Sequence, residues 1–109
     1  MIRATTPLQE FTFDEDPSNF SRILITYAQD EEVILEKEKS DLTITPEYDE
    51  EGNIIDYLAS YRMTQEEANL FEAGAIQVQI RVLTNAGDAL AGDKTTIKVE
   101  DVLNDVVLT

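Results

Sequence analysis

The chain has 109 residues, 42% of them hydrophobic, a composition that fits one globular domain with a modest core. It contains no cysteine and no histidine, which excludes disulfides and thiol catalysis and removes the commonest general base and metal ligand. Eight Lys and Arg against 23 Asp and Glu give a net charge of −15, which opposes binding to nucleic acid or to anionic membranes.

The first third of the chain predicts three short strands separated by polar turns. The second strand alternates clearly, with Ile23, Ile25 and Tyr27 on one face. The short acidic segment 30–32 is typical of a hairpin connection between an antiparallel pair. The three predicted strands are Leu8–Phe13, Arg22–Ala28 and Val33–Lys39.

Residues 42–62 predict a long acidic hairpin. Its strands, Leu42–Tyr48 and Ile54–Arg62, are separated by a strong turn over residues 49–53. Pro46 favours an edge position for the first of these strands, because proline has no N–H to donate to a neighbouring strand.

A capping box marks the start of a helix. The side chain of Thr64 can accept a hydrogen bond from the N–H of Glu67, and the Glu67 side chain can reach back to the N–H of Thr64. We expect a short helix over Gln65–Phe71, with Leu70 and Phe71 docking it on a sheet.

The C-terminal part predicts a second hairpin. Ala75–Thr84 alternates strictly, a turn over 85–88 follows, and Lys94–Val99 forms the returning strand. Residues 101–108 suit either a short helix or a final strand. The apolar face of the first strand consists of Ile76, Val78, Ile80 and Val82, and its solvated face of Gln77, Gln79 and Arg81.

The strand spacing predicts the fold class. Six to eight short strands at hairpin spacing, with one short helix near residues 65–71, indicate a mainly β protein. We expect an immunoglobulin-like antiparallel β-sandwich that forms a single domain over residues 1–109. The term describes architecture alone, because the Cys…Trp…Cys signature of true immunoglobulin domains is absent.

The uneven distribution of charge indicates a surface for protein contacts. Residues 30–51 contain ten acids and two lysines, whereas residues 75–99 contain three cations and two acids. A nearly neutral surface costs less to desolvate, so we expect the C-terminal hairpin to contact other proteins. The candidate contact residues are Gln77, Gln79, Arg81 and Lys98.

Patterns that suggest chemistry have simpler structural interpretations. The spacing Asp49-x-Glu51-x-Asn53 alternates oxygen ligands as calcium loops do, but Gly52 is fourth rather than sixth and Ser60 stands where an EF-hand has its final glutamate. The acidic clusters at 14–16 and 30–32 are typical of charged turns. The four tyrosines can stack on a sugar, although strand packing is favoured. We assign no catalytic, cofactor-binding or metal-binding residue and expect no enzymatic activity and no cofactor.

A resemblance rests on stretches spread along most of the chain. They are Thr5–Pro7, Ile25–Asp30 (ITYAQD), Val33–Lys37 (VILEK), Met63–Glu67 (MTQEE) and Gln79–Asp93 (QIRVLTNAGDALAGD), followed by a Val- and Leu-rich end. Together they resemble small uncharacterised proteins of Firmicutes phages and prophages. The resemblance implies an immunoglobulin-like domain similar to the N-terminal domain of phage baseplate upper proteins, and it implies no ligand. In the proteins that the chain resembles, a short hairpin joins the third strand to the TQEE helix. The corresponding hairpin here, over residues 42–62, is longer and more acidic.

The resemblance also implies a function. We expect a phage or prophage virion structural or adaptor protein of the tail, neck or head. Its partners are other virion proteins or further copies of itself, held through sheet edges or the C-terminal hairpin. Residues 1–7 lack the apolar stretch of a secretory signal, so we expect a protein that is cytoplasmic when synthesised and located in the virion after assembly.

Two alternative functions stay open. The net charge of −15 suits an acidic inhibitor that mimics DNA. The tyrosine-containing hairpin over 42–62 suits a carbohydrate- or calcium-binding module.

Overall fold

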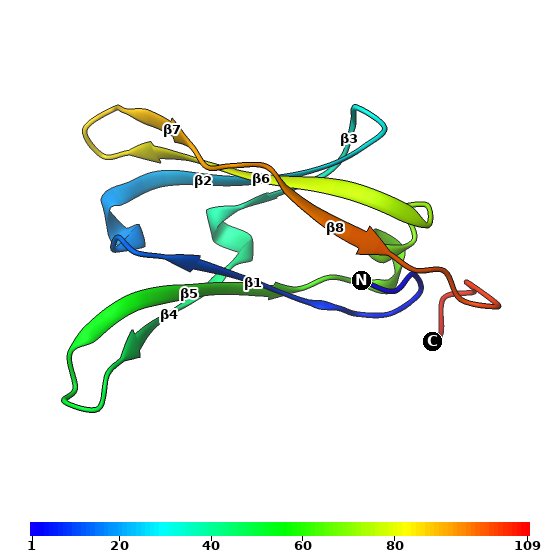
Figure 1. The fold of residues 1–109 in the computed structure, drawn as a ribbon, viewed down its shortest axis with the longest axis horizontal. Helices are drawn as coiled ribbons and strands as arrows, with labels where there is room; N and C mark the ends of the chain where they lie inside the picture. The colour runs from blue at the N-terminus through cyan, green and yellow to red at the C-terminus, as the bar shows by residue number, and fades with distance from the viewer.

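Two antiparallel β-sheets face each other in the computed structural model, which describes residues 1–109 (Figure 1). The three-stranded sheet has the order β1-β5-β4, and the five-stranded sheet has the order β3-β2-β6, with β7 and β8 both paired to β6. The predicted β-sandwich is therefore confirmed. Its elements are β1 (Leu8–Phe13), β2 (Phe20–Gln29), β3 (Glu32–Glu38), β4 (Thr43–Tyr48), β5 (Ile54–Arg62), α1 (Gln65–Ala68), β6 (Gly74–Thr84), β7 (Ala89–Ala91) and β8 (Thr95–Val99).

The strand order is that of an immunoglobulin-like domain without its first strand. Strands β1, β5 and β4 take the places of strands B, E and D, while β3, β2, β6 and β8 take those of C′, C, F and G. The segment that precedes β1 does not pair with it. Instead, Ile2 forms a parallel bridge with Glu100 at the end of β8. The free side of β1, where strand A would lie, therefore has no neighbouring strand.

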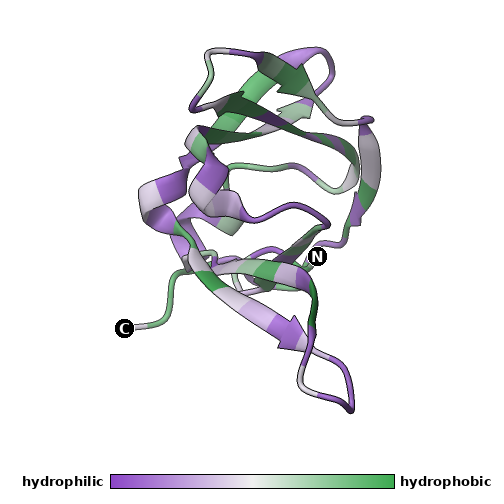
Figure 2. Ribbon diagram, turned by 90° about the vertical axis from the view of Figure 1, so that its left-hand side faces the viewer, coloured by the Kyte–Doolittle hydropathy of each residue, from purple (hydrophilic) through white to green (hydrophobic).

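The core lies between the two sheets, and the predicted alternation decides which side chains enter it. On β2 the face predicted to be apolar is fully buried, whereas Leu24 and Thr26 on the opposite face are half-buried. Figure 2 shows the hydrophobic stretches of the strands alongside the hydrophilic tip of the β4–β5 hairpin. The central cluster consists of Phe20, Ile23, Ile25, Tyr27, Tyr61, Met63, Ala68, Phe71, Ile76, Val78 and Val99.

Two tyrosines place their hydroxyl groups in this core, where both groups form hydrogen bonds. The Tyr61 hydroxyl donates to the Tyr27 hydroxyl at 2.6 Å, and the Tyr27 hydroxyl donates to Gln9 Oε1 at 3.1 Å. Burial raises the pKa of Tyr61, and it raises the pKa of Tyr27 to about 12. The Nζ atom of Lys37 lies 5.4 Å from the centre of the Tyr61 ring, a cation–π distance.

The β2–β3 hairpin is tighter than predicted. Asp30 and Glu31 alone form the connection, because Glu32 already belongs to β3 and pairs with Gln29. Both turn residues have a positive φ, 53° for Asp30 and 66° for Glu31. Two successive positive φ angles define a type I′ turn, whose twist matches that of the flanking strands.

The helix begins as predicted and ends earlier. The capping box of Thr64 and Glu67 is present, but α1 ends at Ala68 rather than Phe71. The N–H groups of Leu70 and Phe71 bond to carbonyls three residues back, which tightens the chain into a turn toward β6. Because the helix has already ended, the two side chains diverge. Phe71 is fully buried, whereas Leu70 is 53% exposed and does not dock on the sheet.

The C-terminal segment after Glu100 is neither helix nor strand. Its backbone is held by side chains from other parts of the chain. Gln65 exchanges two hydrogen bonds with Leu108, at 2.8 and 2.9 Å, and Arg3 forms ion pairs with Asp101 and Asp105. The Leu103 side chain is fully exposed.

An ion pair between Lys37 and Glu67 joins β3 to α1. Burial opposes the charge on Glu67, but hydrogen bonds from Lys37 and from the N–H of Thr64 outweigh it and lower the pKa of Glu67. A lowered pKa in the folded state stabilises the fold above the ordinary value of 4.5, and this contribution is lost as the pH falls through the folded pKa. We expect Glu67→Gln to destabilise the fold by about 1–2 kcal/mol at neutral pH.

Urea unfolding at a series of pH values measures this effect. The difference between wild type and Glu67→Gln should shrink as the pH drops below 4.5. Glu66→Gln is the matched control, since Glu66 is exposed and makes no ion pair. If the free energies of unfolding of wild type and Glu67→Gln differ by the same amount at every pH, the lowered pKa of Glu67 is contradicted.

Candidate protein-binding surface

The four candidate contact residues lie on the outer face of the five-stranded sheet. Gln77, Gln79 and Arg81 alternate along β6 with the inward-facing apolar residues, and Lys98 lies on β8 next to Ala75. Gln77, Arg81 and Lys98 are exposed. Gln79 is half-buried, because its side-chain amide donates to the carbonyl of Gly92 at 2.9 Å. The structure thus brings the four residues to one face, and their role in binding stays a prediction.

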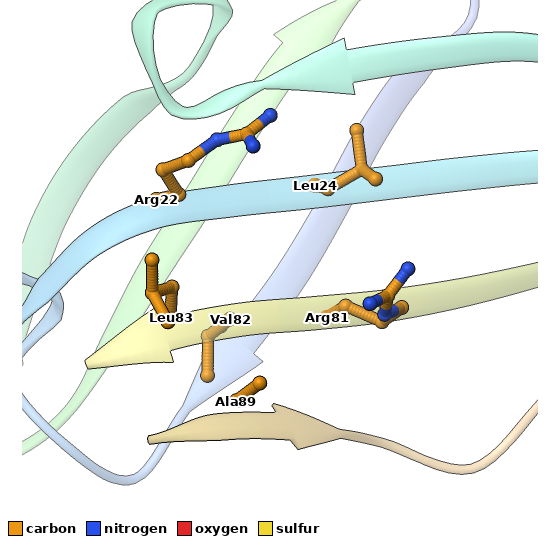
Figure 3. A pocket seen from close by; sticks show the side chains of 6 residues that line it. All are labelled: Arg22, Leu24, Arg81, Val82, Leu83 and Ala89. Carbon is orange, nitrogen blue, oxygen red and sulfur yellow. The ribbon is translucent and has the colours of Figure 1, made fainter. Parts of the chain in front are cut away.

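A shallow depression of about 180 Å³ lies on the same face (Figure 3). Strand pairing creates it, since Leu24 of β2 lies opposite Arg81 of β6, and Arg22 lies opposite Leu83. The β2 side of this site was not predicted from the sequence. The alternation of β2 places Arg22 and Leu24 away from the core, but only the register shows that they adjoin Arg81. The lining residues are Arg22, Leu24, Arg81, Val82, Leu83 and Ala89.

Four of the five strands on this outer face carry no negative charge, whereas β3 at the edge of the sheet contributes Glu36 and Glu38. Strands β2, β6, β7 and β8 contain no Asp or Glu, and their outer side carries Arg22, Arg81 and Lys98. We call these three residues, with the sheet surface between them, the cationic strip. Arg22 is paired with Glu38 of β3 at 2.5 Å, and Lys98 is 3.6 Å from Glu100. Arg81 has no carboxylate within ion-pair distance.

The chemistry of Arg81 suits contact with another protein. A guanidinium presents a planar set of donors that binds a carboxylate through two hydrogen bonds, and it also stacks on aromatic rings. Aliphatic Leu24 and Leu83 beside it add apolar area. Arginine with adjoining apolar surface is enriched at protein interfaces.

The acidic turn proposed as a calcium loop uses its carboxylate to hold the backbone. Asp49 Oδ1 accepts hydrogen bonds from the N–H groups of Glu51 and Asn53, both at 2.9 Å. The bond from the N–H of Asn53 is the largest cause of the lowered pKa of Asp49. No group of three or more acidic side chains lies close enough to hold a metal ion.

The tyrosines do not form one exposed face. Tyr27 and Tyr61 are buried in the core, Tyr57 is half-buried, and only Tyr48 is exposed, at 59%. Two of the four rings are therefore unavailable for stacking on a sugar.

One pair of carboxylates was not foreseen from the sequence. Glu47 of β4 lies directly opposite Asp56 of β5, on the outer side of the three-stranded sheet. A hydrogen bond to Asp56, followed by its charge, raises the pKa of Glu47. Glu47 is exposed. The remaining acidic clusters lie in turns at both ends of the sandwich, including the β2–β3 and β4–β5 turns (Figure 1).

Comparison with known protein families, curated proteins and solved structures finds no match to the chain. The resemblance to phage proteins therefore stays a prediction. No helix has the length and apolar character needed to cross a membrane.

Proposed function

We propose that the protein is a non-enzymatic structural or adaptor protein of a phage or prophage virion, which binds other proteins through the cationic strip. The observation that carries the proposal is the contrast of charge. Four neighbouring strands lack acidic residues in a chain with a net charge of −15. The resemblance of several stretches to small phage proteins supports the virion part of the proposal.

The charge contrast favours an acidic partner surface, and the chain itself provides one. Residues 30–51 contain ten acids and two lysines, and they include the β2–β3 turn and the first part of the β4–β5 turn. A cationic strip that contacts the acidic segment of the next copy makes a head-to-tail interface. Such interfaces generate rings when the rotation closes and filaments when it does not.

Size-exclusion chromatography with light scattering tests the proposal. We expect a species larger than the 12.3 kDa monomer at about 50 mM salt, and a shift toward the monomer at about 500 mM salt as screening grows. Arg81→Glu should abolish the larger species at low salt, because it places a negative charge where the acidic partner docks.

Arg62→Glu is the matched control. It makes the same change of charge on β5, in the other sheet, where Arg62 is exposed and forms no ion pair. This variant should assemble like the wild type. A wild-type monomer at both salt concentrations contradicts self-assembly, and an Arg81→Glu variant that still assembles contradicts the cationic strip as the interface.

A further inference from the structure

One side of the sandwich has two unpaired sheet edges. Strand β1 pairs only with β5, while β7 and β8 pair only with β6. Each of these edges therefore presents backbone N–H and C=O groups that no neighbouring strand satisfies. Such edges are templates for the addition of another strand.

An apolar groove runs between these edges. It consists of two adjoining hollows of about 350 and 270 Å³, which share Thr12, Ile80 and Gly92. Its apolar lining comes from both sheets and includes Phe11, Phe13, Val78, Val82, Leu90 and Ile97. Glu10 and Asp93 are the only charged residues that line it.

The groove lies where an immunoglobulin-like sandwich has its first strand. The segment Met1–Arg3 enters this position only at the end of β8, where the N-terminal ammonium donates to the Lys98 carbonyl at 2.9 Å. The chain then turns away at Ala4, which has a φ of 57°. The edge over residues 89–97 is therefore left uncovered.

We propose that this open side binds an extended segment of another protein in which apolar and basic residues alternate. The segment adds a strand to the sandwich. In a strand successive side chains point to opposite sides, so the apolar set enters the groove while the basic set points toward solvent. There the basic set meets Glu10 and Asp93, which line the groove but are themselves exposed. Backbone hydrogen bonds supply affinity, and the alternation supplies specificity.

Charge decides between a foreign segment and a segment of a second copy. The exposed apolar segment of this chain, residues 101–108, contains Asp101 and Asp105, which are already paired with Arg3. Inserted into a second copy, these acids would lie beside Glu10 and Asp93. Two chains of net charge −15 also repel each other at a groove whose lining contains no cation. A basic foreign segment has neither disadvantage.

Hydrogen exchange and NMR titration with synthetic peptides test the proposal. The probe is an octapeptide of four Lys-Val repeats, blocked at both ends. The controls are four Glu-Val repeats and a block peptide with four lysines followed by four valines. We expect only the Lys-Val peptide to bind, with new protection of amides in residues 8–13 and 93–97 and little change at Gln77, Gln79 and Arg81. The groove lining includes none of Arg22, Arg81 and Lys98, so protection at residues 8–13 without change at Arg81 distinguishes this site from the cationic strip.

Two double variants distinguish peptide binding in the groove from non-specific electrostatic attraction of the peptide to an acidic protein. Glu10→Lys/Asp93→Lys should weaken Lys-Val peptide binding roughly tenfold or more. Glu50→Lys/Glu66→Lys makes the same change of charge at exposed positions outside the groove and should bind like the wild type. Equal weakening in both double variants, equal binding of the block peptide, or no binding at millimolar peptide would overturn the proposal.

Discussion

Replacing Phe71 by alanine is expected to destabilise the protein by about 3–5 kcal/mol, the usual cost of deleting a buried aromatic side chain. Phe71 is fully buried, and its ring centre lies 5.9 Å from that of Tyr27. It connects the segment after α1 to the inner face of β2. Domains of this size are stable by about 5–15 kcal/mol, so the variant should be close to unfolding at room temperature.

Urea unfolding followed by far-UV circular dichroism measures this loss, since the chain has no tryptophan to report by fluorescence. The neighbouring variant Leu70→Ala is the matched control. Leu70 is 53% exposed, and its truncation should change the free energy of unfolding by no more than about 0.5 kcal/mol. Equal losses in the two variants would show that the helix continues through residue 71 and that both side chains pack on the sheet.

Removing the hydroxyl group of Tyr27 should destabilise the protein more than removing that of Tyr61. In Tyr27→Phe the buried Tyr61 hydroxyl loses its acceptor, and an unsatisfied buried donor costs about 1–3 kcal/mol. In Tyr61→Phe the Tyr27 hydroxyl still donates to Gln9, so only one net hydrogen bond is lost, at about 0.5–1.5 kcal/mol. We therefore expect Tyr27→Phe to be the more destabilising change.

A double-mutant cycle isolates the interaction between the two hydroxyls. The variant with both changes leaves no unsatisfied donor, so its loss of stability should be smaller than the sum of the two single losses. Each phenylalanine keeps the ring and its packing, which makes the comparison specific for the hydroxyl groups. Additive losses, or a larger loss for Tyr61→Phe, would contradict the direction of donation from Tyr61 to Tyr27.

Strands β1, β2, β5 and β6 were predictable because they alternate between core and solvent, whereas the exposed β7 was not predicted. The bounds of β1 and β5 agree with the sequence prediction, and the alternation on β6 correctly separates Ile76 and Val78 from Gln77 and Arg81. The capping box likewise marked the start of α1, since its two hydrogen bonds depend on residues only three apart. All these signals are local in the chain.

Features that depend on tertiary contacts were not predictable from the sequence. The end of α1 at Ala68 places Phe71 in the core and Leu70 outside it, and no periodicity in the sequence indicates this early end. Residues 101–108 lack regular structure, because side chains such as Gln65 hold their backbone in place. The depression around Arg81 can be located only once the register of β2 against β6 is known. The groove beside β1 likewise depends on how one sheet packs over the other.

The short parallel pairing at the start of the chain has a mechanical consequence. Met1–Arg3 runs alongside the end of β8 and is joined to it by hydrogen bonds between Met1 and Lys98, Arg3 and Glu100, and Glu100 and Met1. Tension applied between residue 1 and residue 101 pulls these two parallel segments in opposite directions along their length. The three bonds are then loaded in shear and must break together, whereas bonds loaded from one end of a hairpin open one at a time. A pull between residues 1 and 101 is therefore opposed by all three bonds at once.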